Sequence, residues 1–425
     1  MRSLGVSNTG RDHAEMMLHG HRFLLRAGLA IGNVFAWIFV FDYFFSLSGS
    51  IEKALVGVLL MYGLSQGVTM ILTPIASAQL RHGTRGAMLW ALILAASAFV
   101  VLGAALGGLF NGAVESLWGV AAFALFLGAY RALYFVPYEL NRLPVALRSA
   151  PARALRTGGQ ARGNVKKSYP YDSVFFEMLL AFIPAFAGAT FLVEAYAPLK
   201  LLFGAAAFAG ISALPLFLIP NIHERFTFSY AETFSEFFAR RNRRFLWASF
   251  LEGAQGAALF LIWPLAVFLI IGGSYATLGV IFSVTLLCIL LFRIVYRSSF
   301  SGLTKRYSTT THITFAVSGW VARLAAGSPL GVVIADTYAY TAHPVRGTSV
   351  DPFVFEQSAD AGSFIDEYTT LKELGLAAGR ITLAAVVGMF VFATPVVVAF
   401  AIALLLAAVS AGISVSLARH HEAAQ

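Results

Sequence analysis

Six charged residues interrupt stretches of sequence that are otherwise apolar. Inside a lipid bilayer each such charge costs about 2.5 to 3.5 kcal/mol to insert, so a charge that is kept there is a functional candidate by default. The chemistry open to these side chains is binding of a charged solute, proton transfer, or ion pairing between helices. The six residues are Arg131, Glu177, Glu252, Asp336, Glu373 and Arg380.

The composition indicates that a membrane does surround these residues. Of 425 residues, 58% are hydrophobic and 12% are charged, whereas a soluble domain is close to a quarter charged. A soluble chain of this length would need far more polar surface, which excludes a soluble enzyme. The aromatic content of 14% excludes disorder, and the single Cys288 excludes a disulfide framework or a cysteine-rich metal site. We therefore predict an integral membrane protein.

Twelve stretches are long and apolar enough to be membrane-spanning helices, which need about 20 such residues. The ninth and tenth are short for two crossings and could instead form a re-entrant hairpin, which would leave the direction of the later spans unchanged. The predicted spans cover residues 22–47, 54–80, 86–109, 114–137, 173–195, 198–220, 245–271, 274–296, 309–326, 328–344, 371–393 and 395–418.

The distribution of basic residues predicts that both termini are cytoplasmic, because short cytoplasmic loops carry the excess of Lys and Arg. With the N-terminus inside, the outer connections hold only Lys53 and Lys200, with Arg323 near an outer helix end. Topology beside anionic lipid therefore accounts for most of the net charge of +9. The sequence has no run of basic residues interleaved with aromatic residues, so nucleic-acid binding is not expected. We expect a multi-pass protein of a bacterial inner membrane.

A charged segment, 221–244, divides the chain into two halves of six spans. Within it, Ser229 and Glu232 have the spacing of a capping box, and aromatic residues recur behind them at helical spacing. We predict an amphipathic helix on the inner membrane face. The predicted domains are a tail, 1–21; a first bundle, 22–220; the linker, 221–244; a second bundle, 245–418; and a tail, 419–425.

Three short motifs accompany this layout. An R-x-G-x-R loop, Arg81, Gly83 and Arg85, follows the second span. The run DEYTTLKELGLAAGR, 366–380, enters the eleventh span, and FVPYELNR, 135–142, leaves the fourth.

The layout and these motifs resemble the major facilitator superfamily. The resemblance implies an all-α integral membrane fold, with twelve transmembrane helices in two pseudo-symmetric six-helix bundles. It further implies secondary active transport by alternating access. The loop departs from the family in one respect, since the acidic residue that usually precedes the first Arg is Leu80 here.

Depth along the spans, from a helical rise of about 1.5 Å per residue, suggests two ion pairs. Arg131 and Glu177 lie at similar depth in the first half, as do Asp336 and Arg380 in the second. Glu373 and Arg380, seven residues apart, share one face of the eleventh span. Each pair could pin two helices together or line a path for substrate or protons, and the sequence leaves both open.

Glu252 is the preferred candidate for proton coupling. The sequence places no basic residue at its depth in the same half, and a carboxyl group in a low-dielectric site can exchange a proton near neutral pH. The alternative is that Glu252 faces water near the inner end of its helix.

The two long inner loops are of opposite charge. The loop at 138–172 is rich in Arg and Lys, and the loop at 345–370 is rich in Asp and Glu. Their attraction would favour the outward-facing state and would be screened by salt. The alternative is a basic loop that faces lipid and an acidic loop that faces water.

We predict a secondary active transporter that moves a small organic solute, coupled to a proton or sodium gradient. No phosphate-binding, dinucleotide-binding or hydrolase motif is present, so we expect neither an enzyme nor a cofactor, and we expect a monomer. The alternatives are a membrane scaffold or sensor of similar fold, and a lipid-handling membrane protein. A transporter needs polar residues that face a central cavity, whereas a scaffold can pair all its charges between neighbouring helices.

Overall fold

The computed structural model describes residues 8–110, 112–148, 171–193, 197–224, 226–299, 309–341 and 365–422. Each of the twelve predicted spans corresponds to a helix there, with α9 and α10 together forming the seventh. The α-helices are α1 (Asn8–Ser48), α2 (Ile51–Ala78), α3 (Thr84–Leu106), α4 (Ala113–Arg148), α6 (Tyr171–Thr190), α7 (Ala197–Ile211), α8 (Tyr230–Phe238), α9 (Arg243–Ala257), α10 (Trp263–Ile270), α11 (Tyr275–Ser299), α12 (Thr309–Leu324), α13 (Pro329–Thr341), α16 (Ile365–Ala393) and α17 (Val396–Glu422).

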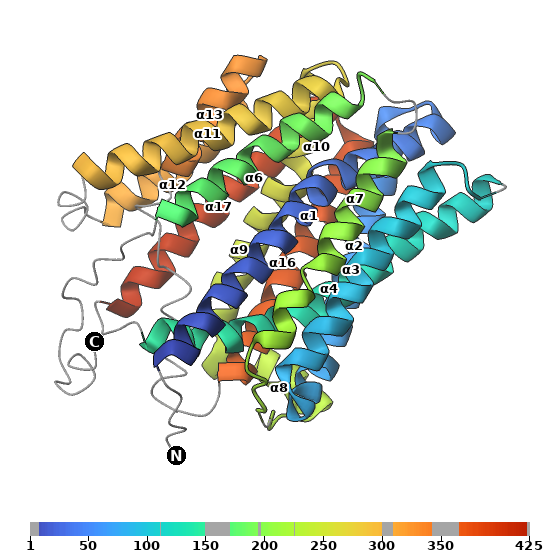
Figure 1. The fold of residues 1–425 in the computed structure, drawn as a ribbon. Helices are drawn as coiled ribbons and strands as arrows, with labels where there is room; N and C mark the ends of the chain where they lie inside the picture. Colours follow the sequence, from blue (N-terminus) through green and yellow to red (C-terminus); the bar gives the residue numbers. More distant parts are fainter. Residues whose placement is uncertain are drawn as a thin grey trace.

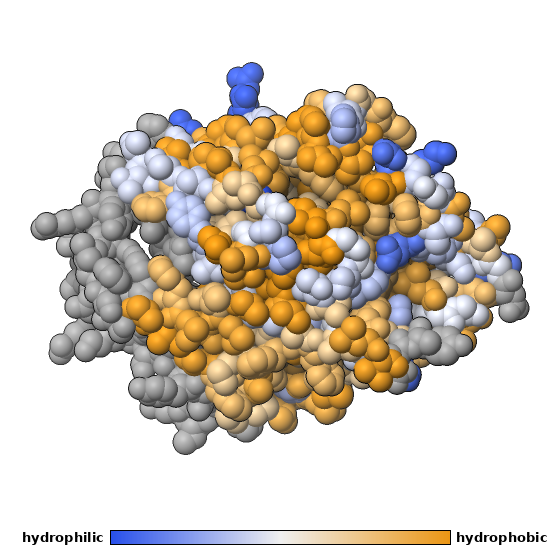
Figure 2. Space-filling model, turned by 90° about the horizontal axis from the view of Figure 1, so that it is seen from above, coloured by the Kyte–Doolittle hydropathy of each residue, from blue (hydrophilic) through white to orange (hydrophobic). Residues whose placement is uncertain are grey.

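The helices of the described residues have the length and surface of membrane spans. Nine of them are long and apolar enough to cross a bilayer. Large apolar side chains point outward, among them Phe186 with 77% of its surface exposed and Trp118 with 72%. Figure 2 shows one face of the molecule, where apolar residues cover most of the surface. In water such a surface would aggregate, so the chain is a multi-pass membrane protein whose outer face is covered by lipid.

The ninth and tenth helices are the shortest of the twelve, as the sequence predicts. Helix α12 has 16 residues and α13 has 13. At about 1.5 Å per residue they extend roughly 24 and 20 Å, against about 30 Å for the hydrocarbon core. The two pack against each other, and α13 also packs against α11.

The helices form two bundles, which meet along several helix pairs. Helix α16 of the second half packs against α2 and α4 of the first, α11 packs against α6, and α10 packs against α1. Helix α1 begins and α17 ends at the same end of the molecule, where α8 also lies (Figure 1). One large apolar core runs through both halves, so the bundles are closely packed.

Helix α1 begins at Asn8, well before the predicted start of the first span at residue 22. Part of the predicted tail, 1–21, is therefore helical. His21 explains why, because it is fully buried. Its Nδ1 donates to the carbonyl of Ser212 at 2.7 Å, and its Nε2 lies 3.0 Å from the hydroxyl of Tyr134. These contacts fix α1 to α4 and to the end of α7.

The seventh span contains a turn of π-helix, Ala258–Ile262, between α9 and α10. Pro264 follows it and has no N–H to donate to the carbonyl four residues earlier. The wider turn takes up this missing bond. It also sets the direction of Trp263, whose indole is buried. This irregularity was not predicted from the sequence.

The predicted helix of the linker is confirmed as α8. The backbone N–H of Ser229 donates to Oε2 of Glu232 at 2.7 Å, and the N–H of Glu232 donates to the Ser229 hydroxyl at 3.2 Å. These bonds stabilise the carboxylate and hold the pKa of Glu232 below its ordinary value. The capping box is therefore present above that pKa and is lost as the pH falls through it.

The linker is attached to each half by hydrogen bonds. At its start, the N–H of Arg85 donates to Oδ1 of Asn221 at 3.0 Å, and the Arg85 guanidinium donates to the carbonyl of Ile219 at 2.5 Å. Further on, the N–H and the hydroxyl of Thr227 both donate to Oε1 of Glu367, at 2.9 and 2.6 Å. The first turn of α3 and the first turn of α16 therefore each bind one end of the same short segment.

The R-x-G-x-R loop serves this attachment. Gly83 has φ +106° and packs on the side chain of Asn221. Arg85 bonds a backbone carbonyl, and Arg81 donates from Nε to the ring of His82 at 3.1 Å. Leu80, in place of the usual acidic residue, is fully buried with Val136 and Leu140.

We expect replacement of Gly83 by Ala to destabilise the protein by about 1 to 3 kcal/mol, since only Gly adopts this backbone conformation without strain. An added Cβ would also lie 2.3 Å from the Asn221 side chain. Thermal unfolding in detergent measures the loss. Gly86→Ala is the matched control, because an added Cβ there meets no heavy atom within 4 Å. Equal melting temperatures for the two variants would contradict this role of Gly83.

Candidate functional site

Four of the six predicted charged residues gather where α2, α4, α9 and α16 meet. Arg131 on α4 is close enough to Glu373 and Arg380 on α16 to interact electrostatically. Glu373 in turn interacts with Glu252 on α9. We call Tyr62, Gln66, Arg131, Glu252, Glu373 and Arg380 the interface cluster. Both halves of the chain contribute to it.

Glycines bring α9 and α16 into backbone contact and so place one side of the cluster. A Cβ on Gly379 would lie 1.9 Å from the carbonyl oxygen of Phe250, and one on Gly253 would lie 2.2 Å from that of Leu376. Small residues allow such close approach of helices in a membrane. Arg380 follows Gly379 directly, so the helix contact fixes where its side chain leaves α16. The Gly-Arg pair of the eleventh-span motif has this structural use.

A hydrogen bond between the halves holds Arg380. Its Nη1 donates to Oε1 of Gln66 on α2 at 3.2 Å. Gln66 is fully buried, and its Nε2 has no hydrogen-bond partner among the described residues. The bond therefore satisfies the carbonyl oxygen of the Gln66 amide, whereas its NH2 group is left without an acceptor in the described chain.

Arg131 is a cluster member with an unsatisfied buried hydrogen-bond donor. It lies in the middle of α4, and its Nη1 is buried with no hydrogen-bond partner in the described part of the chain. The groups that act on it electrostatically include Tyr62, Tyr130 and Glu373. A buried guanidinium without a bonded carboxylate is costly. Arg131 therefore stands out as a group that needs a partner from outside the chain.

The predicted pair of Arg131 and Glu177 is not formed, because Glu177 is not the acidic residue that acts on Arg131. Helix α6 packs chiefly against α11 and α1, whereas α4 packs against α2, α3 and α16. The carboxyl group near Arg131 belongs to Glu373. The sequence gives the depth of a residue along its helix but not the neighbour that its face meets.

Asp336 is paired with Arg323 and not with Arg380. Its Oδ1 accepts from Nε of Arg323 at 2.7 Å, and its Oδ2 accepts from the indole N–H of Trp263 at 2.9 Å. Both side chains of the ion pair are 4% exposed. The Arg323 guanidinium also lies 4.6 Å from the ring centre of Trp320. The pair holds α10, α12 and α13 together, as a structural ion pair does.

Sequence reasoning placed Arg323 near an outer helix end and so missed it. The available signal was the short connection between α12 and α13, which puts the two helices side by side. Arg323 and Asp336 lie on facing turns of that hairpin. Trp320, one turn before Arg323, marks the same buried face.

An aromatic cluster closes the interface at the end opposite α8. The hydroxyl of Tyr275, at the start of α11, donates to Oδ2 of Asp42 near the end of α1. The Tyr275 ring stacks on Phe191 with centroids 4.4 Å apart and lies 4.9 Å from Phe268 and 5.3 Å from Phe39. These rings come from both halves. Asp42 was not among the predicted site residues.

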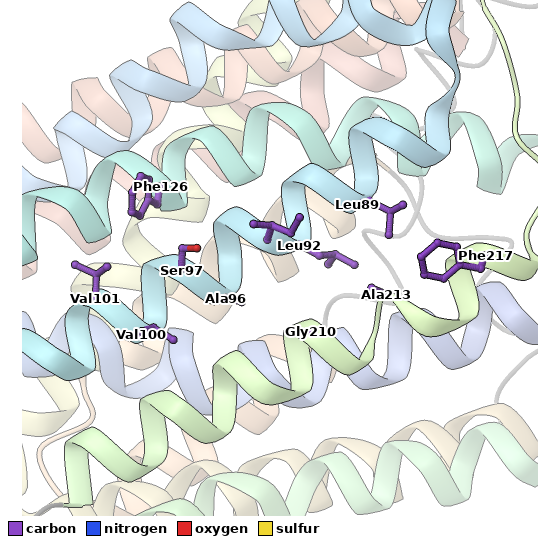
Figure 3. Close-up of a pocket in the computed structure, with 11 residues that line it drawn as sticks. Leu89, Leu92, Ala96, Ser97, Val100, Val101, Phe126, Gly210, Ala213 and Phe217 are labelled. Carbon is purple, nitrogen blue, oxygen red and sulfur yellow. The ribbon is translucent and has the colours of Figure 1, made fainter.

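Two cavities lie on apolar seams and have none of the charged residues of the interface cluster in their linings. One, of about 660 Å³, runs between α3 and α7 and is lined by residues such as Leu92, Val100 and Phe217 (Figure 3). The other, of about 410 Å³, lies between α2 and α16 and is lined by residues such as Leu60 and Met389. Their linings contain no charged residue, so neither is a site for a charged solute.

The predicted gate between the two long inner loops lies largely outside the described residues, which omit 149–170 and 342–364. It stays a prediction. Two acidic residues of the predicted acidic loop are described, Asp366 and Glu367. Both are buried, and Glu367 accepts from Thr227.

By sequence, the chain matches no protein-family model and no curated protein. Its fold is similar to several solved structures. A bacterial homologue of the iron transporter ferroportin, in an inward-facing state, is 14% identical with a TM-score of 0.59, covering 98% of this chain and 99% of that one. A D-xylose–proton symporter is 13% identical with a TM-score of 0.57, covering 95% and 97%. The nucleoside transporter NupG is 15% identical with a TM-score of 0.51, covering 96% and 98%.

At these identities the comparisons show the fold. The chain has the twelve-helix fold of the major facilitator superfamily, and the resemblance found in the sequence is confirmed at that level.

Breaking the buried pair should destabilise the protein strongly. We expect Asp336→Leu and Arg323→Met each to cost about 3 to 5 kcal/mol, because each leaves an uncompensated buried charge or polar partner. The double variant should lose less than the sum of the two, as measured by unfolding in detergent.

The surface pair of Glu236 and Arg241 supplies the control. The Arg241 side chain is 68% exposed, so Arg241→Met should cost about 0 to 1 kcal/mol. Strictly additive losses in the Asp336 and Arg323 cycle would contradict the pairing.

Proposed function

We propose that the chain is a secondary active transporter, which moves a small organic solute by alternating access and is coupled to a proton or sodium gradient. The observation that supports this best is the interface cluster. Arg131, Gln66 and Arg380 each lie near the middle of their helices, and they come from both halves. Transporters of this kind bind substrate near the midplane between their repeats.

The partners of the charges favour a transporter over a scaffold. A scaffold gains from pairing every charge between neighbouring helices, as Arg323 and Asp336 are paired. Arg131 has no such pair among the described residues. A buried charge that lacks a partner costs stability, and a substrate that supplies the partner gives a reason to keep it.

Hydrogen bonds between the halves lie at opposite ends of the interface, so those at one end can break while those at the other remain. At one end the Tyr275 hydroxyl bonds Asp42, and toward the other the hydroxyls of Ser77 and Thr370 share a bond of 2.7 Å. Each such bond contributes about 0.5 to 1.5 kcal/mol, or somewhat more to a charged group. Few polar contacts would therefore oppose rocking of one bundle against the other.

Glu252 remains the candidate for proton coupling. It interacts with Glu373, which is buried. Two interacting carboxyl groups titrate as a coupled pair, so a proton bound there would change the charge felt by Arg131 and Arg380. This links the coupling ion to the proposed substrate groups.

We place the protein in a bacterial inner membrane as a monomer, with both termini cytoplasmic. The basic linker supports this orientation, because α8 lies at the end where α1 begins and α17 ends (Figure 1). Arg240, Arg241, Arg243 and Arg244 are all exposed on that side.

A membrane scaffold or sensor is the second candidate. The ion pair of Arg323 and Asp336 and the apolar linings of both cavities favour it. The same cavities would suit a lipid chain, which is the observation in favour of a lipid-handling protein.

Uptake into proteoliposomes tests the proposal. With D-xylose, uridine, succinate, citrate, alanylalanine and choline as probes, we expect at least one to accumulate when a pH or sodium gradient is imposed. Empty liposomes provide the baseline. If no probe accumulates under either gradient, the scaffold becomes the better account.

For a probe that accumulates with the pH gradient, Glu252→Gln should abolish the dependence on that gradient, since the amide cannot exchange the proton. The protein must still be found in the membrane in normal amount. Glu236→Gln, on the surface linker, is the control and should leave coupling intact. Unchanged coupling in Glu252→Gln would rule this residue out.

A further inference from the structure

Hydrogen-bond donors are left over at one end of the interface cluster. Nη1 of Arg131 and Nε2 of Gln66 are buried and have no hydrogen-bond partner among the residues that the structure describes. The hydroxyl groups of their sequence neighbours Ser65 and Tyr130 are also buried, with no hydrogen-bond partner among the described residues. Guanidinium and amide N–H groups can only donate. The group that would satisfy them must therefore be an acceptor.

Two guanidinium groups from opposite halves lie near each other here. Arg131 and Arg380 are close enough to repel each other. Within the described chain neither forms an ion pair with a carboxylate, and the bond from Arg380 goes to the neutral amide of Gln66. Like charges held together in a low-dielectric site are unfavourable unless an anion lies between them.

The contrast with Arg323 is informative because both sites are buried in the same protein. Arg323 has the Asp336 carboxylate at 2.7 Å and the face of Trp320 at 4.6 Å. That arrangement is complete without a ligand. The site at Arg131 and Arg380 lacks the corresponding acid.

The nearby carboxyl groups do not fill this role. Glu373 precedes Arg380 by seven residues on α16, which is two turns, or about 10 Å along the helix axis. Glu252 interacts with Glu373. Along α16 the charges are therefore separated, with Arg380 near the middle of the helix and Glu373 two turns nearer its start.

We infer that the interface cluster binds the oxyanion group of a small solute, a carboxylate or a phosphate, between Arg131 and Arg380, with the Gln66 amide as a further donor. The planar fork of each Arg matches such a group, which accepts two parallel hydrogen bonds. A neutral solute would leave the two positive charges facing each other, and a cation would add a third. The inference rests on the proposed function and names its substrate class.

Binding to the purified full-length protein tests the inference. The melting temperature in detergent is measured with benzoate, succinate, citrate and inorganic phosphate, with D-xylose and uridine as neutral probes and choline as the cation, all at equal ionic strength. We expect at least one of the four anions to raise the melting temperature in a saturable manner. The phosphate arm separates a phosphate site from a carboxylate site.

Variants locate the binding. Arg131→Gln and Arg380→Gln should each weaken the apparent affinity for the stabilising anion at least tenfold, and Arg→Lys at either position should weaken it less. Arg240→Gln, on the exposed linker, is the control and should leave the affinity unchanged. If a variant fails to fold, the probe series on the unaltered protein still decides the matter. Undiminished stabilisation in both Gln variants would place the anion elsewhere and overturn the inference, as would stabilisation by none of the four anions.

Uptake assays keep this inference apart from the proposed function. An anion that binds at Arg131 and Arg380 but never accumulates in proteoliposomes supports the site and contradicts transport. Accumulation of D-xylose, uridine or choline with none of the anions supports transport and overturns the anion site.

Discussion

A charge inside a lipid bilayer has to be satisfied by the protein or by something the protein binds, because neither water nor free counter-ions are available there. Two buried arginine sites in this chain meet that constraint differently. Arg323 has a carboxylate, an indole N–H behind that carboxylate and an aromatic face, all supplied by the second half. Arg380 is bonded to one neutral amide, and Nη1 of Arg131 has no hydrogen-bond partner among the described residues. The first arrangement makes two short helices stable, and the second gives the interface between the halves its chemistry.

Helix α16 connects the rest of the structure to that interface. Its glycines lie directly against the backbone of α9, and it packs on α2 and α4 of the first half as well. Its first turn also accepts two hydrogen bonds from the linker through Glu367. A displacement of α16 would therefore be felt at the helix contact, at the Gln66 bond and at the linker together. This makes α16 the element through which binding of a solute would reach the remainder of the fold.

The sequence predicts the fold well and the site only in part, for a physical reason. Hydropathy depends on the residues of one segment, so all twelve helices could be located from it. Four of the six charged residues that interrupt those helices do meet. Their partners depend on the rotation of each helix about its axis and on which helices are neighbours, and a single sequence holds neither. Depth alone therefore paired Glu177 with Arg131, whereas the carboxyl group that acts on Arg131 electrostatically belongs to Glu373, with no hydrogen bond to Nη1 of Arg131. It also assigned Arg380 to Asp336, where the structure has Arg323.

The attachment of the linker at two nearby points sets a mechanical stop. Asn221 is held by the loop after α2, and Thr227 is held by α16. Only residues 222–226 separate these anchors, and so short a piece of chain extends to roughly 20 Å at most. As long as both anchors hold, the two bundles can separate at that end only as far as this tether allows. A wider opening requires one anchor to be released. If Thr227 leaves Glu367, two hydrogen bonds are broken, so these two bonds limit how far the bundles separate.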